Sequence, residues 1–174
     1  MTRKAILIAG SPTANSRSTW LLDSFGQELA GRGFQLESFN VESFPPEALL
    51  RGQFDGVAVK RFSESLKGAH AVVFSTPVYK ATYAGSLKVI VDLIDPGALE
   101  GKALLGIASA KLAAHLTEVD QNFQRLYAFF RGSRGLPSLG LLDAQLGAPG
   151  AHVLDTTAKQ QFEAALQSVE RATS

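Results

Sequence analysis

The fold is decided by Ala5-Ile-Leu-Ile-Ala-Gly-Ser-Pro-Thr-Ala-Asn-Ser-Arg-Ser-Thr19, close to the amino end of the chain. Its first five residues form a short apolar run that Gly10 ends, which is typical of a buried strand. From Ser18 to Arg32 apolar residues recur mostly at helical spacing, so a helix is expected after the polar turn. The stretch therefore predicts a buried strand that leads through a hydroxyl-rich loop into a helix.

The same alternation continues along the chain, without a repeat or a low-complexity linker. Further strands are expected at 34–40, 69–75, 102–109 and 139–146, and further helices at 55–68, 85–95, 118–131 and 155–172. Phe44–Pro46 is interpreted as a loop, and Asp155 as the N-cap of the last helix. Strands that alternate with helices imply a parallel sheet covered on both faces. We expect one α/β domain, residues 1–174, folded as a flavodoxin-like three-layer sandwich around a five-stranded parallel sheet in the order 2-1-3-4-5.

The composition excludes several classes of function. The 174 residues carry a net charge of +1 without a basic block, so no nucleic-acid partner is expected. There is no cysteine, and the three histidines lie far apart, so no metal site is expected. No window is long enough for a membrane span, and no signal-peptide core precedes the first polar stretch. A cytoplasmic enzyme or carrier is the expectation.

The loop after the first strand has the chemistry of an anion site. Ser11, Ser16 and Ser18 supply hydroxyl groups, and the start of the following helix supplies unpaired N–H groups. Arg17 adds a cation that can clamp a phosphate at two oxygens. The loop matches neither Gly-x-Gly-x-x-Gly nor Gly-Lys-Ser/Thr, which argues against a dinucleotide pyrophosphate site and a nucleoside triphosphatase. The alternative is a polar surface loop with an ordinary serine N-cap.

A second loop follows the third expected strand, at 75–88. Its small and hydroxyl residues, together with Pro77, allow a planar ring to approach the backbone. Tyr79 or Tyr83 can stack on an aromatic ligand, with packing at the sheet edge as the alternative. In doubly wound sheets, ligands bind outside the carboxyl ends of the strands where the strand order reverses. Both loops belong to that edge.

At this point the sequence resembles a known family. Gly10-Ser-Pro…Ser16-Arg-Ser and then Thr76-Pro-Val-Tyr-Lys-Ala…Gly85-Ser-Leu-Lys88…Asp92 resemble the NAD(P)H-dependent FMN reductases. The chain is most similar to the flavin reductases of two-component alkanesulfonate monooxygenase systems. The similarity runs from about Lys4 to about Asp120, with nearly ungapped spacing. Two motifs at the two expected strand ends make the resemblance specific.

The resemblance implies a function and a site. It implies that a homodimer or homotetramer binds FMN, accepts hydride from NADPH or NADH, and supplies reduced flavin to a flavin-dependent monooxygenase. Because the cofactor carries the chemistry, no catalytic side chain is named. By the resemblance, the phosphate is held by Ser11, Ser16, Arg17 and Ser18, and the ring is lined by Pro77, Val78, Tyr79 and Lys80, with Ser109, Ala110 and Lys111 in the third loop of the site.

Three departures from the family qualify this expectation. Thr13 stands where many relatives carry a basic residue, which leaves Arg17 as the only cation of the first loop. Ala110 and Lys111 replace a Gly-Gly pair, so that Lys111 either pairs with the O2 region of the flavin or narrows the pocket. Gln121 stands where relatives that use FMN only as a substrate carry a tyrosine that distorts the helix. We therefore hypothesise a regular helix and FMN retained as a prosthetic group.

Other functions remain open at the level of sequence. A quinone or azo-compound reductase would share the fold and the phosphate loop. A non-enzymatic flavin carrier is usually strongly acidic, whereas the isoelectric point here is about 8.0. A receiver-type signalling domain needs a cluster of acids after the first strand, and Ile8-Ala-Gly-Ser-Pro12 has none. A flavin-free relative kept for protein interactions is the fourth alternative. The helix at Ser86–Ile94 is expected at a dimer contact, or its apolar stripe serves only the sheet.

Overall fold

The computed structural model describes residues 2–147 and 150–174, in which strands and helices alternate. The strands are β1 (Arg3–Ala9), β2 (Phe34–Phe39), β3 (Ala71–Tyr79), β4 (Thr82–Tyr83), β5 (Ala103–Ala110), β6 (Arg134–Gly135) and β7 (Leu139–Leu142). The helices are α1 (Arg17–Gly31), α2 (Pro46–Arg51), α3 (Val57–Lys67), α4 (Gly85–Val91), α5 (Ala113–Phe129) and α6 (Thr156–Ala172), with 3-10 turns η1 (Val41–Ser43) and η2 (Asp143–Leu146). None of these helices combines the length and the apolar character needed to cross a bilayer.

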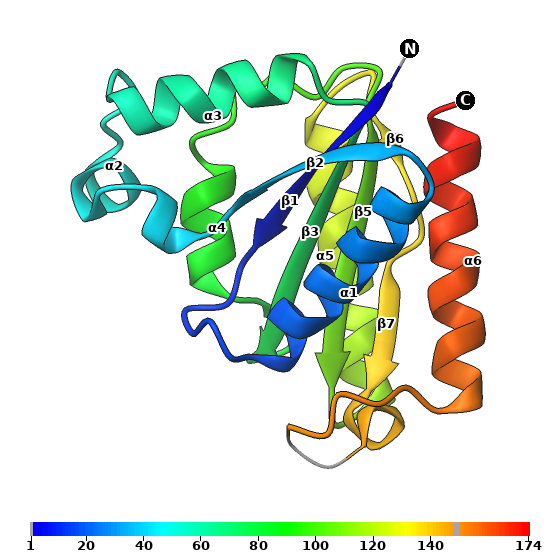
Figure 1. The fold of residues 1–174 in the computed structure, drawn as a ribbon. Coiled ribbons are helices and arrows are strands. Elements are labelled where there is room, and N and C mark those ends of the chain that lie inside the picture. The colour runs from blue at the N-terminus through cyan, green and yellow to red at the C-terminus, as the bar shows by residue number, and fades with distance from the viewer. Residues whose placement is uncertain (1, 148–149) are drawn as a thin grey trace.

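The strands form a mainly parallel sheet (Figure 1). Its order is β2-β1-β3-β5-β6, and β7 pairs with the carboxyl half of β5 beyond β6. Pairing in register places Ile6 beside Val72, and Val72 beside Leu104, in the centre of the sheet. With β5 as the fourth strand, and β6 and β7 sharing the fifth position, the expected order 2-1-3-4-5 is confirmed.

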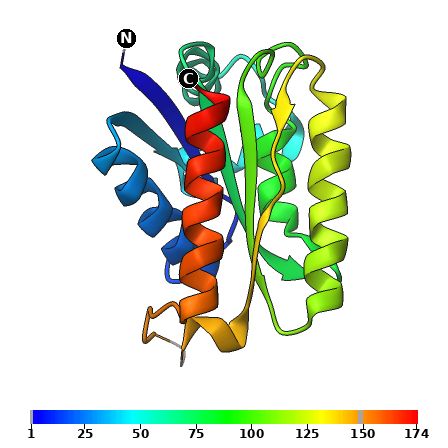
Figure 2. The same cartoon turned by 90° about the vertical axis from the view of Figure 1, so that its right-hand side faces the viewer.

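Helices cover both faces of the sheet (Figures 1 and 2). Successive residues of a strand point to opposite faces, so β1 sends Ile6 and Ile8 to one core and Ala5 and Leu7 to the other. The first core lies under α2, α3, α4 and α5, and the second under α1 and α6. The three-layer sandwich is thereby confirmed, and each β-to-α loop emerges at one edge.

The number and extent of the strands differ from the expectation. Within the described residues the sheet has seven strands instead of five, because the last strand is divided and β4 pairs antiparallel with the end of β3. Pro137 lies between β6 and β7 and has no N–H to donate to β5. The strand expected at 139–146 ends at Leu142, and η2 follows it.

The helix boundaries were also partly wrong. The loop expected at 44–46 leads directly into α2, whose first residue, Pro46, has a fixed φ that suits a helix start. The helix expected to reach Asp95 ends at Val91, four residues earlier. Pro96 accounts for part of this difference, since proline disfavours helical geometry in the residue before it. Helix α5 begins at Ala113, because the alanines that open it favour a helix without adding to an apolar stripe.

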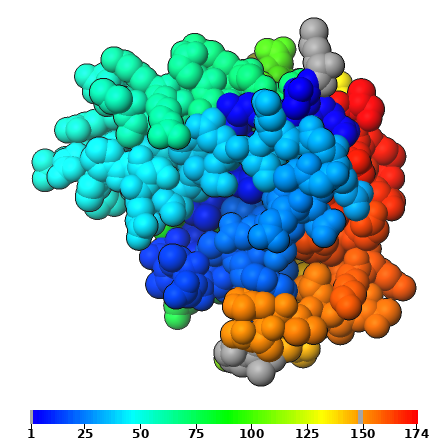
Figure 3. Space-filling view, in the orientation of Figure 1, coloured from blue at the N-terminus to red at the C-terminus, as the bar shows by residue number. Residues whose placement is uncertain are grey.

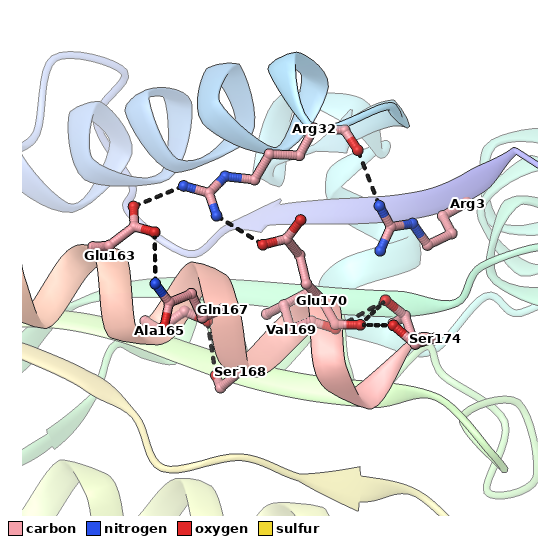
Figure 4. Close-up of polar contacts among 10 residues, drawn as sticks. Arg3, Arg32, Glu163, Ala165, Gln167, Ser168, Val169, Glu170 and Ser174 are labelled. Carbon is pink, nitrogen blue, oxygen red and sulfur yellow. Dashed lines mark hydrogen bonds and ion pairs between the residues drawn. The ribbon is translucent and has the colours of Figure 1, made fainter.

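Polar contacts hold the last helix against the first. Asp155 is the N-cap of α6, as expected, and its side chain accepts a hydrogen bond of 2.7 Å from the backbone of Ala158. Arg32, at the end of α1, donates to Glu163 and Glu170 on α6, both at 2.7 Å (Figure 4). These hydrogen bonds raise the pKa of Arg32, and the bond from Arg32 lowers the pKa of Glu163. The α1–α6 layer is therefore joined by charge as well as by its apolar core.

Candidate functional site

A pocket of about 600 Å³ opens at the carboxyl edge of the sheet. Strand order reverses between β1 and β3, because the chain goes from β1 to β2 on one side and from β3 to β5 on the other. Such a switch point is where doubly wound sheets bind ligands. The pocket is lined by Ser16, Arg17, Ser18, Pro77, Val78, Tyr79, Ser109, Ala110, Lys111, Leu112, His115 and Asp143.

The first turn of α1 forms one side of this pocket. Ser16 is the N-cap, and its Oγ accepts a hydrogen bond of 3.0 Å from the backbone N–H of Thr19. A helix start leaves its first N–H groups without an intrahelical acceptor, so those of Arg17 and Ser18 are free to bind a ligand. The Ser18 hydroxyl lies 3.0 Å from the Ser16 hydroxyl. This turn offers N–H groups, hydroxyls and the positive end of a helix dipole to an anion.

Gly10 allows the first loop to lie against two neighbouring elements. Its N–H donates to the Ser75 carbonyl of β3 at 2.8 Å, and its own carbonyl accepts from the Ser86 hydroxyl at 2.6 Å. A Cβ at this position would lie 2.6 Å from the Ser75 oxygen and 2.5 Å from the Cβ of Leu87. Only glycine fits this approach, and it fixes where α1 begins relative to the end of β3.

The end of β3 forms a second wall. Pro77, Val78 and Tyr79 line the pocket there, and the Tyr79 side chain is 52% exposed. The hairpin that joins β3 to β4 turns through Lys80 and Ala81, whose φ angles of 53° and 62° lie in the left-handed region. Two such residues are the signature of a type I′ hairpin turn, which aligns β4 with the twist of β3. The wall is thus a largely apolar strand end whose position is fixed by a tight turn.

The end of β5 forms the third wall and carries charge. Ser109 pairs in register with Pro77, so the second and third loops are direct neighbours. Lys111 is exposed and lines the pocket. Asp143 directly follows Leu142, which pairs with Ala110 of β5, and Arg17 Nη1 lies 2.8 Å from Asp143 Oδ2. Two cations and one carboxylate therefore line the pocket.

The structure brings together every predicted site residue except Ser11 and Lys80. Ser11 is buried, and its Oγ accepts a hydrogen bond of 3.1 Å from the N–H of Thr13, so it shapes the loop. Tyr83 does not line the pocket, and its ring packs 5.9 Å from that of Phe123. Helix α5 is α-helical throughout, which confirms the regular helix expected from Gln121.

Sequence reasoning missed three residues of the pocket, namely Leu112, His115 and Asp143. Leu112 and His115 belong to the start of α5, whose beginning was predicted too late. Asp143 directly follows β7. Its place after a parallel strand was a signal that could have found it, because the carboxyl ends of such strands share one edge.

The strand order, with an anion-binding helix start beside an apolar strand end at the switch point, defines a flavodoxin-like protein. The match to a family model narrows this class. The model of the NADPH-dependent FMN reductases matches residues 3–138, and the chain belongs to that family.

Relatives and solved structures agree with this assignment. An FMN reductase (NADPH) from Escherichia coli strain K12 is 35% identical over 165 residues, which cover 95% of this chain and 83% of that protein. The NADH-dependent FMN reductase SfnF from Pseudomonas putida is 24% identical over 170 residues, 95% of this chain and 90% of the relative. The apo form of the NADH:FMN oxidoreductase EMOB superposes with a TM-score of 0.89 at 25% identity, over 99% of this chain and 91% of that one. A flavodoxin from the domain Archaea, at a TM-score of 0.64 and 11% identity over 98% of this chain and 99% of that one, shares the fold.

Proposed function

We propose that this protein transfers hydride from NADPH or NADH to FMN, and that residues 1–174 act as one FMN-binding domain. The observation that carries the proposal is the pocket itself, where an anion-binding helix start and an apolar strand end face the same space. Its volume of about 600 Å³ lies within the usual range for small-molecule sites. Hydroxyls, N–H groups and Arg17 suit a monophosphate, so the donor set fits FMN.

In this proposal the first turn of α1 holds the phosphate. The N–H groups of Arg17 and Ser18 and the hydroxyls of Ser16 and Ser18 are the donors, and Ser11 supports them by fixing the loop. Charge-assisted hydrogen bonds of this kind are the stronger class in proteins. The cradle therefore orients the flavin from the end remote from the reacting ring.

The ring end is assigned to the other two walls. Pro77, Val78 and Tyr79 offer apolar surface against which a flat ring can pack, while Lys80 lies in the adjoining turn. Ser109 and Ala110 complete the slot, and Lys111 adds positive charge at its rim. FMN, when bound, supplies the hydride-accepting ring. The protein's contribution is to align this ring with a nicotinamide and to exclude water, so no acid–base side chain is assigned.

The direct test is to titrate the purified protein with FMN and to follow NADPH and NADH oxidation with FMN, quinone and azo acceptors in separate assays. The proposal expects saturable FMN binding and faster nicotinamide oxidation with FMN than with the other acceptors. No FMN binding, or no oxidation in its presence, would overturn it. Preference for a quinone or azo acceptor would replace it with the alternative reductase function.

A matched pair of serine variants tests the phosphate cradle. Ser18→Ala removes a buried hydroxyl from the pocket, whereas Ser24→Ala removes one from the same helix away from it. A hydrogen bond to a charged group contributes about 1.5–3 kcal/mol, so Ser18→Ala is expected to weaken FMN binding about tenfold or more. Riboflavin, which has no phosphate, and the Ser24→Ala control are expected to show little change. Equal effects in both variants would remove the cradle from the proposal.

Retention of FMN is a separate prediction. The regular α5 supports the hypothesis that FMN stays bound as a prosthetic group, because the distortion associated with loosely bound flavin is lacking in Ala113–Phe129. Protein loaded with FMN is then expected to leave a gel-filtration column yellow. Complete loss of colour, together with micromolar or weaker affinity in a titration, would contradict the hypothesis.

We further propose a homodimer or homotetramer that serves a flavin-dependent monooxygenase. Because the apolar stripe of α4 (Leu87, Ile90 and Val91) is buried against its own sheet, we propose that the contact is the exposed groove beside it. A groove of about 530 Å³ beside it exposes Phe54 and Phe129 by 59% and 61%. Sedimentation of wild type and Phe129→Glu tests the contact, with dissociation expected in the variant. A monooxygenase added as a reporter, with free FMN in solution, tests whether the protein supplies it with reduced flavin.

A further inference from the structure

The phosphate side of the pocket contains a carboxylate. Asp143 is the first residue of η2, and its Oδ2 lies 2.8 Å from Arg17 Nη1. Both side chains are partly exposed, Arg17 by 30% and Asp143 by 22%, and both line the pocket. Among the lining residues within 2–147 and 150–174, Asp143 is the only acid. An anion that approaches Arg17 therefore meets a like charge that is already paired with it.

Asp143 is held in place by the backbone around it. The N–H of Leu142 donates to Gln145 Oε1 at 2.7 Å, and the Gln145 carbonyl accepts from the N–H of Asp155 at 2.9 Å. Leu146, the last residue of η2, is buried in the core beneath α1 and α6. The turn that carries Asp143 is consequently anchored at both ends, with the carboxylate beside Arg17.

A second contact joins the same two regions. The ring of His152 lies 5.0 Å from that of Trp20, one turn along α1 from Arg17. Figure 3 shows the orange segment that follows β7 directly against the blue first turns of α1. The ion pair is thus part of an interface between α1 and the connection to α6.

The first loop has no second cation to compensate. Arg17 is the only basic residue in 10–19, with Thr13 exposed and hydrogen-bonded only within the loop. Lys111 follows Ala110, which pairs in register with Leu142, so it lies at the strand end next to Asp143, but within the described residues Asp143 pairs with Arg17 and not with Lys111. With Asp143 beside it, Arg17 brings little net positive charge to a phosphate, although its N–H groups remain available as donors. A like charge beside a binding site lowers the affinity for a charged ligand more than for a neutral one.

We propose that Asp143 is a specificity-determining residue, which competes with the phosphate of the flavin for Arg17 and thereby narrows the difference in affinity between FMN and uncharged riboflavin. The proposal rests on the proposed function, because it takes the flavin pocket as given. It assigns the recognition of flavin in this protein mainly to the pocket walls at the ends of β3 and β5, and only in smaller part to the charge of the phosphate cradle.

The test compares the dissociation constants of FMN and riboflavin for wild type and Asp143→Asn, measured by fluorescence titration of flavin-free protein. Asparagine keeps the size of the side chain and its ability to accept a hydrogen bond from Arg17, but removes the charge. The variant is expected to bind FMN about tenfold more tightly, with riboflavin affinity changed less than twofold. Added salt is expected to weaken FMN binding to the variant more than to wild type, since screening acts on net attraction.

Glu64→Gln is the matched control. Glu64 also pairs with a cation, Lys67, but on α3 and outside the pocket, so the same change in net charge is expected to leave both flavin affinities unchanged. A double-mutant cycle with Arg17→Gln completes the test. The loss of FMN affinity on removing Arg17 is expected to be several-fold greater in the Asp143→Asn background than in wild type.

Weaker FMN binding by Asp143→Asn would overturn the proposal and assign Asp143 to positioning Arg17. An equal change for FMN and riboflavin, or an equal effect of Glu64→Gln, would also overturn it. These failures are distinguishable from failure of the proposed function, in which wild type binds neither flavin and oxidises no NADPH.

Discussion

Replacement of Gly10 by alanine tests whether the first loop is held by close approach to β3 and α4. The added Cβ would lie 2.6 Å from the Ser75 carbonyl oxygen and 2.5 Å from the Cβ of Leu87, where ordinary contacts begin at 3.4 Å. Neither neighbour is the far end of a flexible side chain, because one is backbone and the other is attached directly to it. Strand β3 or helix α4 must therefore shift by several tenths of an ångström.

The magnitude follows from what such a shift disturbs. Overpacking a well-packed site costs about 1–3 kcal/mol, and two rigid neighbours place Gly10→Ala near the upper end, at about 3 kcal/mol. The hydrogen bonds that Gly10 makes with Ser75 and Ser86 are strained by the same displacement. For a chain of this size each kcal/mol lowers Tm by about 2–4 °C, so a fall of about 6–12 °C is expected.

Urea denaturation followed by tryptophan fluorescence measures this effect directly. Trp20 is the only tryptophan in the chain and lies on α1, just beyond the loop. Gly31→Ala is the matched control, since a Cβ there meets nothing within 4 Å, and its effect is expected to stay within about 0.5 kcal/mol. A loss of less than 1 kcal/mol in Gly10→Ala, or equal losses in the two variants, would refute the argument from close approach.

Three further predictions concern other parts of the fold. Ala81→Gly relieves a left-handed residue in the β3–β4 turn and is expected to raise the free energy of unfolding by about 1 kcal/mol, measured by chemical denaturation. Asp155→Ala removes the N-cap of α6 and is expected to cost about 1 kcal/mol, whereas Asp155→Asn keeps most of the stability. The lowered pKa of Glu163 stabilises the fold above its unfolded value of 4.5, and this contribution is lost as the pH falls through the folded pKa. The difference in stability between wild type and Glu163→Gln, measured in urea, is therefore expected at pH 7 and is expected to disappear as the pH falls through the lowered pKa of Glu163 in the folded state.

The order of elements could be predicted because each central strand is a continuous apolar run between helices of clear periodicity. The alternation predicts that β2 and β3 lie on either side of β1, and it predicts that the loops after the strands meet at one edge of the sheet. The last strand could not be predicted in the same way. Its residues pair with β5 in two short pieces, β6 and β7. The pairing is interrupted near Pro137, and only the structure shows that this proline lies beside β5.

Composition marks the first loop as a site but does not show which hydroxyl faces a ligand. Ser11 and Ser16 are the same residue type only five positions apart, yet the Ser11 hydroxyl accepts from the N–H of Thr13 and the Ser16 hydroxyl from that of Thr19. Ser16 and Ser18 line the pocket, whereas Ser11 does not, and the Ser18 hydroxyl contacts the Ser16 hydroxyl. The hydrogen-bond partner of each hydroxyl depends on the local backbone conformation, which the order of residues alone does not specify.

The shape of the phosphate cradle and its net charge depend on different parts of the chain. The family model matches residues 3–138, a range that contains Arg17 but ends before Asp143. The motif therefore accounts for the cation and for the helix start that carries it, while the residue that pairs with the cation comes from the connection between β7 and α6. Because electrostatic energy depends on distance in space rather than along the chain, a change at Asp143 alters phosphate affinity without altering the motif.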